Sequence, residues 1–141
     1  ICVMQDPRGR FSGVQQIFLD GPALAPVHPV KMTLGDPGVI RLAGLQDGTL
    51  TVANDVETAL LLLSASPTRP VWAAIGGTGL RRLTPPPRIR RVELGLRQDQ
   101  VDRRAAAALT QRLLQEGRDV RWFEPPTPGP APDPGLEEAA G

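Results

Sequence analysis

Short apolar runs alternate with helix-like segments over the central part of the chain, and no other feature constrains the fold as strongly. Strands that alternate with helices in this way form a mostly parallel sheet with helices on its faces. The sequence therefore predicts an α/β fold. The expected elements, in chain order, are strand 39–42, strand 49–53, helix 57–65, strand 71–75, strand 90–96, helix 99–116 and strand 120–123.

The two ends of the chain have a different character from this central part. Residues 6–9, Asp-Pro-Arg-Gly, are a turn signal, so residues 1–20 are predicted to form a β-hairpin. Residues 20–38, rich in Gly and Pro, are predicted as a loop. From Pro125 the composition is reduced mainly to Pro, Gly, Ala and Glu, which favours disorder. The predicted division is residues 1–48 as a β-rich lead-in segment, 49–125 as the α/β domain and 126–141 as a Pro-rich disordered tail or linker.

Acidic side chains follow two of the predicted strands. Asp55 and Glu57 come directly after the strand 49–53, and Asp99 and Asp102 follow the strand 90–96. Ligands of open α/β sheets bind outside the carboxyl ends of the strands. Converging carboxylates there are what Mg²⁺ needs, with water and a substrate phosphate completing its shell. These four acids are therefore candidate metal ligands.

The same acids also fit a purely structural role. Asn54 or Asp55 can cap the helix that follows, and Glu57 can complete a capping box. Asp99 can cap the second helix, with Asp102 in its first turn favoured by the helix dipole. On residue types alone, both the metal site and the helix caps remain open.

Arginine dominates the basic residues and is concentrated in one segment. The chain has 16 basic residues and a net charge of +1, and Lys31 is its single lysine. Arginine makes planar, bidentate contacts to phosphate and carboxylate groups. The cluster is therefore a candidate anion-binding face, although a GC-rich genome would also favour arginine over lysine. Its members are Arg81, Arg82, Arg88, Arg90, Arg91, Arg97, Arg103 and Arg104.

Several classes of protein are excluded or disfavoured by the sequence. With one cysteine, Cys2, and one histidine, His28, the chain offers neither a disulfide framework nor an ordinary zinc site. No apolar run reaches the roughly 20 residues of a membrane span, and no signal peptide is visible, so we expect a cytoplasmic protein. The Gly-rich run at residues 76–79 lacks the Lys-Ser/Thr of a P-loop and is predicted as a tight turn. Because the chain begins with Ile1, we expect it to be a piece of a longer protein.

An ordered set of segments resembles a known family. Residues 13–20, 31–35 and 39–42 resemble the segment that leads into the Toprim domain of phage- and plasmid-type DNA primases. Residues 50–60, Leu-Thr-Val-Ala-Asn-Asp-Val-Glu-Thr-Ala-Leu, resemble the first Toprim motif. Residues 91–99, Arg-Val-Glu-Leu-Gly-Leu-Arg-Gln-Asp, resemble the second. The similarity covers most of residues 8–125.

This resemblance implies a four-stranded parallel sheet flanked by helices and a Mg²⁺ site that acts on nucleotides or nucleic acid. The family's site has a glutamate after the first strand and an Asp-x-Asp after a later one. In this sequence those positions hold Asn54, Arg97 and Asp99, so Asn54 and Asp99 are the catalytic positions that the resemblance carries over. It also implies a helicase domain or other replication proteins as partners.

The departures from the family pattern change the expected chemistry. Asn54 removes a negative charge and Arg97 introduces a positive one, which favours a Mg²⁺ site that is impaired or lost. We expect the domain to bind DNA or nucleotide phosphates instead, through Arg97, Arg81, Arg82, Arg103 and Arg104. One alternative is an active Mg²⁺-dependent primase-like nucleotidyltransferase with a rearranged site of Asp55, Glu57, Asp99 and Asp102. A structural α/β domain without a catalytic role is the other.

Overall fold

Four parallel strands form the centre of the molecule in the computed structural model, which describes residues 1–45, 48–98 and 101–126. They are β7 (Gly48–Ala53), β8 (Val71–Ala74), β9 (Ile89–Gly95) and β10 (Asp119–Phe123), in the spatial order β10-β9-β7-β8. Strands covered on both faces read as continuous apolar runs. The α/β fold with a four-stranded parallel part is therefore confirmed.

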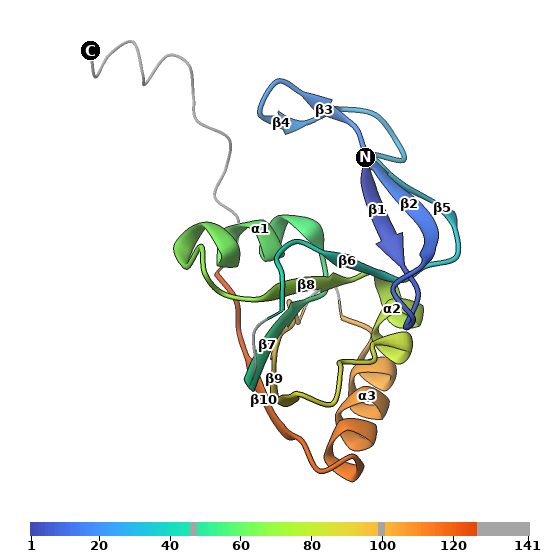
Figure 1. The fold of residues 1–141 in the computed structure, drawn as a ribbon. Coiled ribbons are helices and arrows are strands. Elements are labelled where there is room, and N and C mark those ends of the chain that lie inside the picture. Colours follow the sequence, from blue (N-terminus) through green and yellow to red (C-terminus); the bar gives the residue numbers. More distant parts are fainter. Residues whose placement is uncertain (46–47, 99–100, 127–141) are drawn as a thin grey trace, which may run out of the picture.

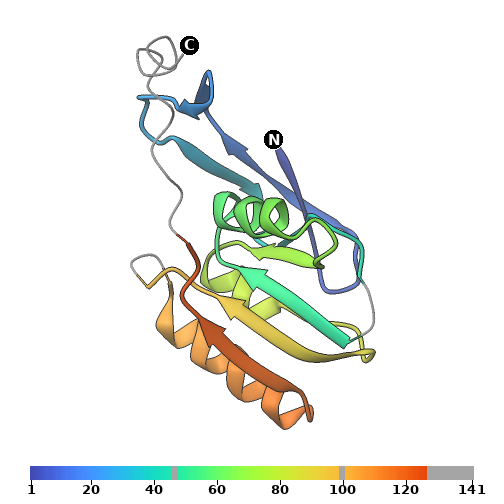
Figure 2. The ribbon, with the colours of Figure 1, turned by 90° about the vertical axis from the view of Figure 1, so that its left-hand side faces the viewer.

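Helices cover both faces of this parallel part (Figures 1 and 2). On one side lies α1 (Val56–Ala65), and on the other lie α2 (Gly76–Arg82) and α3 (Arg103–Gln115). The alternation of side chains along β7 explains this arrangement, since successive residues of a strand point to opposite faces. Leu50 and Val52 pack in the cluster beneath α2 and α3, whereas Ala53 packs in the cluster beneath α1.

The N-terminal hairpin adds strands to the same sheet. As predicted, β1 (Cys2–Gln5) and β2 (Phe11–Ile17) pair antiparallel around the turn at residues 6–9. They join the parallel part through β6 (Val39–Arg41), which pairs antiparallel with β8 and meets β1 at Gln5. The result is an eight-stranded sheet whose outer strand is β5 (Lys31–Gly35).

Two shorter features also lie within the predicted loop 20–38. β5 occupies residues 31–35, so the loop prediction is wrong there. The strands β3 (Leu19–Asp20) and β4 (Ala23–Leu24) form a separate two-stranded sheet. A strand at the edge of a sheet is paired on one side only, and the side chains of β5 are mostly exposed. It therefore lacks the alternating apolar pattern that sequence analysis detects.

The helix α2 begins where a tight turn was predicted. Its first turn contains the glycines of residues 76–79, although glycine is a poor helix former. A Cβ atom added to Gly79 would lie 2.6 Å from the carbonyl oxygen of Gly38. Glycine is thus required at position 79, because the helix lies directly against the backbone of the neighbouring segment.

The helix α3 is shorter than predicted at its start. It begins at Arg103 rather than at residue 99, and Asp102, not Asp99, is its N-cap. Its buried stripe consists of Ala105, Ala106, Leu109 and Leu113.

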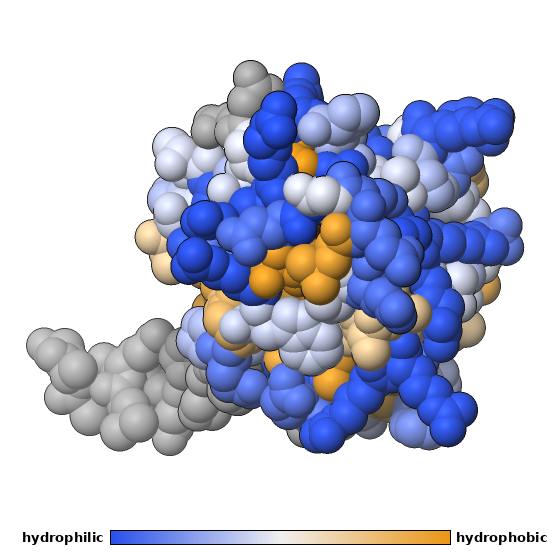
Figure 3. All heavy atoms as spheres, turned by 90° about the horizontal axis from the view of Figure 1, so that it is seen from below, coloured by the Kyte–Doolittle hydropathy of each residue, from blue (hydrophilic) through white to orange (hydrophobic). Residues whose placement is uncertain are grey.

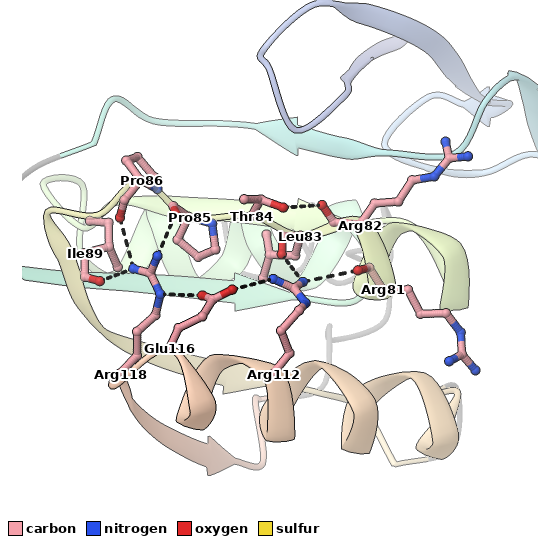
Figure 4. A network of polar contacts seen from close by, with 10 residues as sticks. All are labelled: Arg81, Arg82, Leu83, Thr84, Pro85, Pro86, Ile89, Arg112, Glu116 and Arg118. Carbon is pink, nitrogen blue, oxygen red and sulfur yellow. Dashed lines mark hydrogen bonds and ion pairs between the residues drawn. The ribbon is translucent and has the colours of Figure 1, made fainter.

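A buried arginine holds the segment that joins α2 to β9 (Figure 4). The side chain of Arg118, which is 11% exposed, donates to the carbonyl oxygen of Pro85 at 2.8 Å and of Pro86 at 3.0 Å. It also donates to the carbonyl oxygen of Ile89. Partly buried carbonyl groups outside regular structure need such donors, since an unpaired one is costly.

Arg112, on the last turn of α3, makes a parallel set of contacts. Its guanidinium donates to the carbonyl oxygens of Arg81 and Leu83. Glu116 accepts from Arg112 at 3.2 Å and from Arg118 at 3.0 Å. Although partial burial opposes its ionisation, these hydrogen bonds hold the pKa of Glu116 below its ordinary value of 4.5. Its contribution to stability is therefore present above that value and is lost as the pH falls through the lowered pKa.

None of the helices that the structure describes has the length and apolar character needed to cross a membrane. Seen from below, the molecule presents mainly hydrophilic residues around a small hydrophobic area (Figure 3). The predicted tail at 126–141 lies, apart from Pro126, outside the described residues and stays a prediction, as does the division of the chain at residue 48.

We predict that Arg118→Ala lowers the free energy of unfolding by about 2–3 kcal/mol, because it leaves several carbonyl groups and one carboxylate oxygen of Glu116 without their donor. Urea unfolding followed by circular dichroism measures this difference. The control is Arg121→Ala, whose side chain is 63% exposed and which should stay within about 0.5 kcal/mol of the parent chain. Equal losses in the two variants would contradict the structural role of Arg118.

Candidate functional site

The carboxyl ends of β7 and β9 lie side by side. These two strands are neighbours in the sheet, and Ala53 at the end of one is paired with Gly95 at the end of the other. The chain segments that leave the two strands therefore start from adjacent positions (Figure 2). Asn54 and Asp55 follow the first strand, and Arg97 follows the second. This edge is where ligands bind in open α/β sheets.

Asn54 joins the two strand ends. Its side-chain carbonyl oxygen accepts a hydrogen bond from the backbone N–H of Arg97 at 3.2 Å. The contact spans 43 positions in sequence, so it fixes the geometry of the edge rather than that of a local turn. This oxygen, at the position where the family carries a glutamate, is thus already bound to the backbone.

Asp55 is the N-cap of α1. Its backbone is extended, and its Oδ1 accepts from the backbone N–H of Thr58 at 2.6 Å. The residue is 7% exposed, and its other oxygen, Oδ2, is buried without a hydrogen-bond partner among the described residues. The predicted cap at residues 54–55 is therefore confirmed, with Asp55 as the capping residue.

Arg97 places a positive charge beside this carboxylate. Its Nη1 lies 4.0 Å from Asp55 Oδ2, and the two side chains are 19% and 10% exposed. Charges interact more strongly at such a partly buried position than in open solvent. The guanidinium and the carboxylate thus largely neutralise one another at the strand ends.

Glu57 is paired with a basic residue from a distant strand. Lys31 Nζ of β5 lies 2.6 Å from Glu57 Oε1, and both side chains are about one-third exposed or less. Glu57 stands at the second position of α1, one residue too early to form a capping box with Asp55. The predicted capping box is therefore wrong, and the acid instead links the N-terminal strands to α1.

Asp102 lies against a different element. Its Oδ1 accepts from the backbone N–H of Ala105 at 3.0 Å as the cap of α3. A Cβ atom added to Gly77 would collide with Asp102 Oδ2, so this carboxylate packs directly on the first turn of α2. Asp99, the remaining predicted acid, lies outside the described residues.

The predicted metal ligands are thus distributed over several contacts. Asp55 faces Arg97, Glu57 faces Lys31, and Asp102 faces Gly77. Within residues 1–45, 48–98 and 101–126 there is no group of three or more His, Cys, Asp or Glu side chains that could hold a metal ion. The described carboxylates therefore do not form a group that could share one Mg²⁺ ion.

Four of the predicted phosphate-binding arginines are exposed on the helical layer. Arg81 and Arg82 end α2, while Arg103 and Arg104 begin α3. Figure 4 shows the side chains of Arg81 and Arg82 pointing away from the contact network that holds their segment. Arg82 Nη1 makes one weak contact, to the carbonyl oxygen of Pro37 at 3.3 Å. These groups are accessible to an anion in solution.

Lys31 is the residue at this edge that sequence analysis did not assign to the site. Lys31 falls in a predicted loop, 26 residues before Glu57, so local sequence patterns did not indicate its contact with that residue. One signal was present, since Lys31 is the single lysine of an arginine-rich chain.

Comparisons with known proteins agree with this geometry. The sequence pattern described as the Toprim domain matches residues 49–134. A crystal structure of the Aquifex aeolicus primase, comprising its zinc-binding and RNA polymerase domains, matches with a TM-score of 0.53 at 18% sequence identity. The match covers 86% of this chain and 32% of the primase chain, and at this identity it shows the fold alone. No curated protein matches the chain.

We predict that Asp55→Ala lowers the free energy of unfolding by about 1–2 kcal/mol, because α1 loses its cap. Asp55→Asn should lose less, since asparagine caps helices as well as aspartate does. Urea unfolding of the two variants measures the difference. If the asparagine variant is as unstable as the alanine variant, the charge facing Arg97 matters more than the cap.

Proposed function

The chain belongs to the Toprim domain family, and we propose that it binds nucleic-acid or nucleotide phosphates through arginine side chains, in place of a Mg²⁺ ion, as part of a primase-type replication protein. One observation carries this proposal. The guanidinium of Arg97 lies at the strand ends, 4.0 Å from the buried carboxylate of Asp55. A cationic side chain thus stands where the family resemblance implies a metal-binding aspartate.

The charges at this edge argue against a bound Mg²⁺. The Arg97 guanidinium would repel a divalent ion placed beside it, and it offsets the Asp55 carboxylate that would otherwise attract such an ion. The side-chain oxygen of Asn54 already accepts a hydrogen bond from a backbone N–H, and Glu57 is already paired with Lys31. The described residues do not fit the metal, so no catalytic step is assigned to it.

A guanidinium can itself hold a phosphate. It offers five N–H donors in a plane whose spacing matches two phosphate oxygens. Arg97 is 19% exposed, so part of its side chain reaches solvent, and the nearby carboxylate of Asp55 restrains its position. Holding the side chain in place lowers the entropic cost of binding.

The exposed arginines supply a path for a longer ligand. Arg103 and Arg104 start α3, a few residues beyond Arg97, and Arg81 and Arg82 end the helix α2 that packs against α3. Phosphate contacts position a nucleic acid without reading its sequence. DNA is the ligand we favour, bound with little sequence preference and with strong dependence on salt.

The proposal extends to the larger protein. The chain spans 32% of the primase structure that it resembles, so the activity of a whole protein lies beyond this domain. We propose a primase of the phage or plasmid type, with a helicase domain or other replication proteins as neighbours. In this arrangement residues 1–48 lead into the Toprim domain, and residues 126–141 are a Pro-rich tail or linker.

We predict that Arg97→Ala weakens binding to a single-stranded DNA oligonucleotide and reduces the slope of log affinity against log salt by about 0.7, the value for one lost phosphate contact on a single strand. Fluorescence anisotropy at a series of salt concentrations measures both quantities. Arg97→Lys keeps the charge but loses the planar fork, so it should keep most of the slope and bind more weakly.

The matched control is Arg10→Ala. Arg10 lies in the β1–β2 turn, is 67% exposed and pairs with Asp6. It should leave affinity and slope close to those of the parent chain. Circular dichroism of each variant checks that the fold is retained. An Arg97→Ala variant that is folded and binds with unchanged affinity and slope would overturn the proposal.

A further inference from the structure

A polar cavity lies beside β6, β8 and the segment that precedes β9. Its volume is about 440 Å³, within the range of small-molecule sites. The residues that define it come from several elements near the amino ends of β7, β8 and β9. They are Gln5, Arg41, Leu42, Leu45, Trp72 and Arg88.

A fixed guanidinium forms part of the wall. Arg41 of β6 is paired in the sheet with Trp72 of β8, and its guanidinium carbon lies 4.3 Å from the centre of the Trp72 ring. This is a cation–π contact, which holds the cation over the ring. On another side the guanidinium approaches the β1–β2 turn, where a Cβ atom added to Gly9 would lie 3.5 Å from its Nη1.

The position of Arg41 does not result from an ion pair. Among the described residues, Arg41 has no carboxylate within salt-bridge distance, in contrast to Arg91 and Arg112. None of the described residues that line the cavity is acidic. A second guanidinium, that of Arg88, lines the same cavity from the segment before β9. Arg41 and Arg88 are thus the charged residues of the described lining.

Trp72 contributes an unused hydrogen-bond donor. The residue is 1% exposed, and its indole Nε1 is buried without a partner among the described residues. Buried donors are normally paired, and each exception needs an explanation. The donor belongs to a residue that lines the cavity, and an acceptor on a bound ligand would be one such explanation. Trp122, by comparison, donates its indole N–H to Thr110 Oγ1 at 2.9 Å.

We propose that this cavity binds a phosphorylated mononucleotide. The two guanidinium groups hold the phosphate, since arginine matches its oxygen pairs. Leu42 and Leu45 supply an apolar wall for a base or sugar, and Gln5 supplies a polar group beside it. The Nε2 of Gln5 donates to the carbonyl oxygen of Gly9 at 3.0 Å, which fixes that amide and leaves its oxygen to accept. The ligand that fits this cavity is a phosphate joined to a flat, partly apolar group.

The test uses the fluorescence of Trp72. The variant Trp122→Phe leaves Trp72 as the single tryptophan, because the chain contains two. Uridine monophosphate is titrated into this chain, with inorganic phosphate, uridine and a single-stranded oligonucleotide as separate probes. We expect a saturable change with the nucleotide, and at least about tenfold weaker binding in Arg41→Ala, as for loss of a charged hydrogen bond. Isothermal titration calorimetry of the parent chain and of Arg41→Ala gives the same comparison without the Trp122→Phe change.

One control variant is Arg121→Ala, on the edge strand β10, which should leave nucleotide binding unchanged. The comparison of Arg41→Ala with the parent chain separates this cavity from the proposed DNA-binding edge, because both chains keep Arg97. Binding of inorganic phosphate as tight as that of the nucleotide would overturn the proposal, as would saturation by the oligonucleotide alone. Equal affinities in the parent and Arg41→Ala chains, or no saturable change with the nucleotide, would overturn it too.

Discussion

The contact of Arg97 with Asn54 and Asp55 is the interaction on which the functional edge of this domain depends. The backbone N–H of Arg97 donates to Asn54, and the guanidinium of Arg97 compensates the charge of the Asp55 carboxylate. Asp55 in turn caps α1. The same group of contacts thus caps a helix, fixes the end of a strand and compensates a buried charge. Burying the Asp55 carboxylate without a nearby cation would be costly. The arginine is therefore part of the fold as well as a candidate ligand-binding group.

The arginines of this chain divide into two kinds. Arg112 and Arg118 donate to backbone carbonyl groups at the end of α2 and in the segment that joins α2 to β9. One guanidinium group has five N–H donors, so a single side chain can pair with several of these carbonyl groups. Arg81, Arg82, Arg103 and Arg104 are exposed and make few contacts. Arginine richness alone thus gave an ambiguous signal. Only the positions of the side chains separate structural guanidinium groups from those available to an anion.

Local features of the sequence predicted the parallel sheet and the cap of α1 at residues 54–55, whereas the cap of α3 is Asp102 and not the predicted Asp99. The runs 49–53 and 71–75 are apolar because both faces are covered, and a cap acts within its own turn. Long-range contacts were not predictable. The pairing of Lys31 with Glu57 needs β5, whose exposed side chains carry no clear alternation. The helix α2 forms on glycines because close packing at Gly79 overrides propensity. The metal ligands inferred from spacing meet basic or glycine partners that spacing cannot reveal.

A Mg²⁺ titration followed by amide NMR tests the central claim most directly. The parent chain is compared with the double variant Asn54→Glu, Arg97→Asp, which restores the acidic residues that the family resemblance implies. The account predicts no saturable shifts at Asn54, Asp55 or Arg97 in the parent chain at millimolar Mg²⁺, and clustered saturable shifts in the double variant if it remains folded. Clustered, saturable shifts at these residues in the parent chain would show that a metal binds beside the arginine, and would contradict the account.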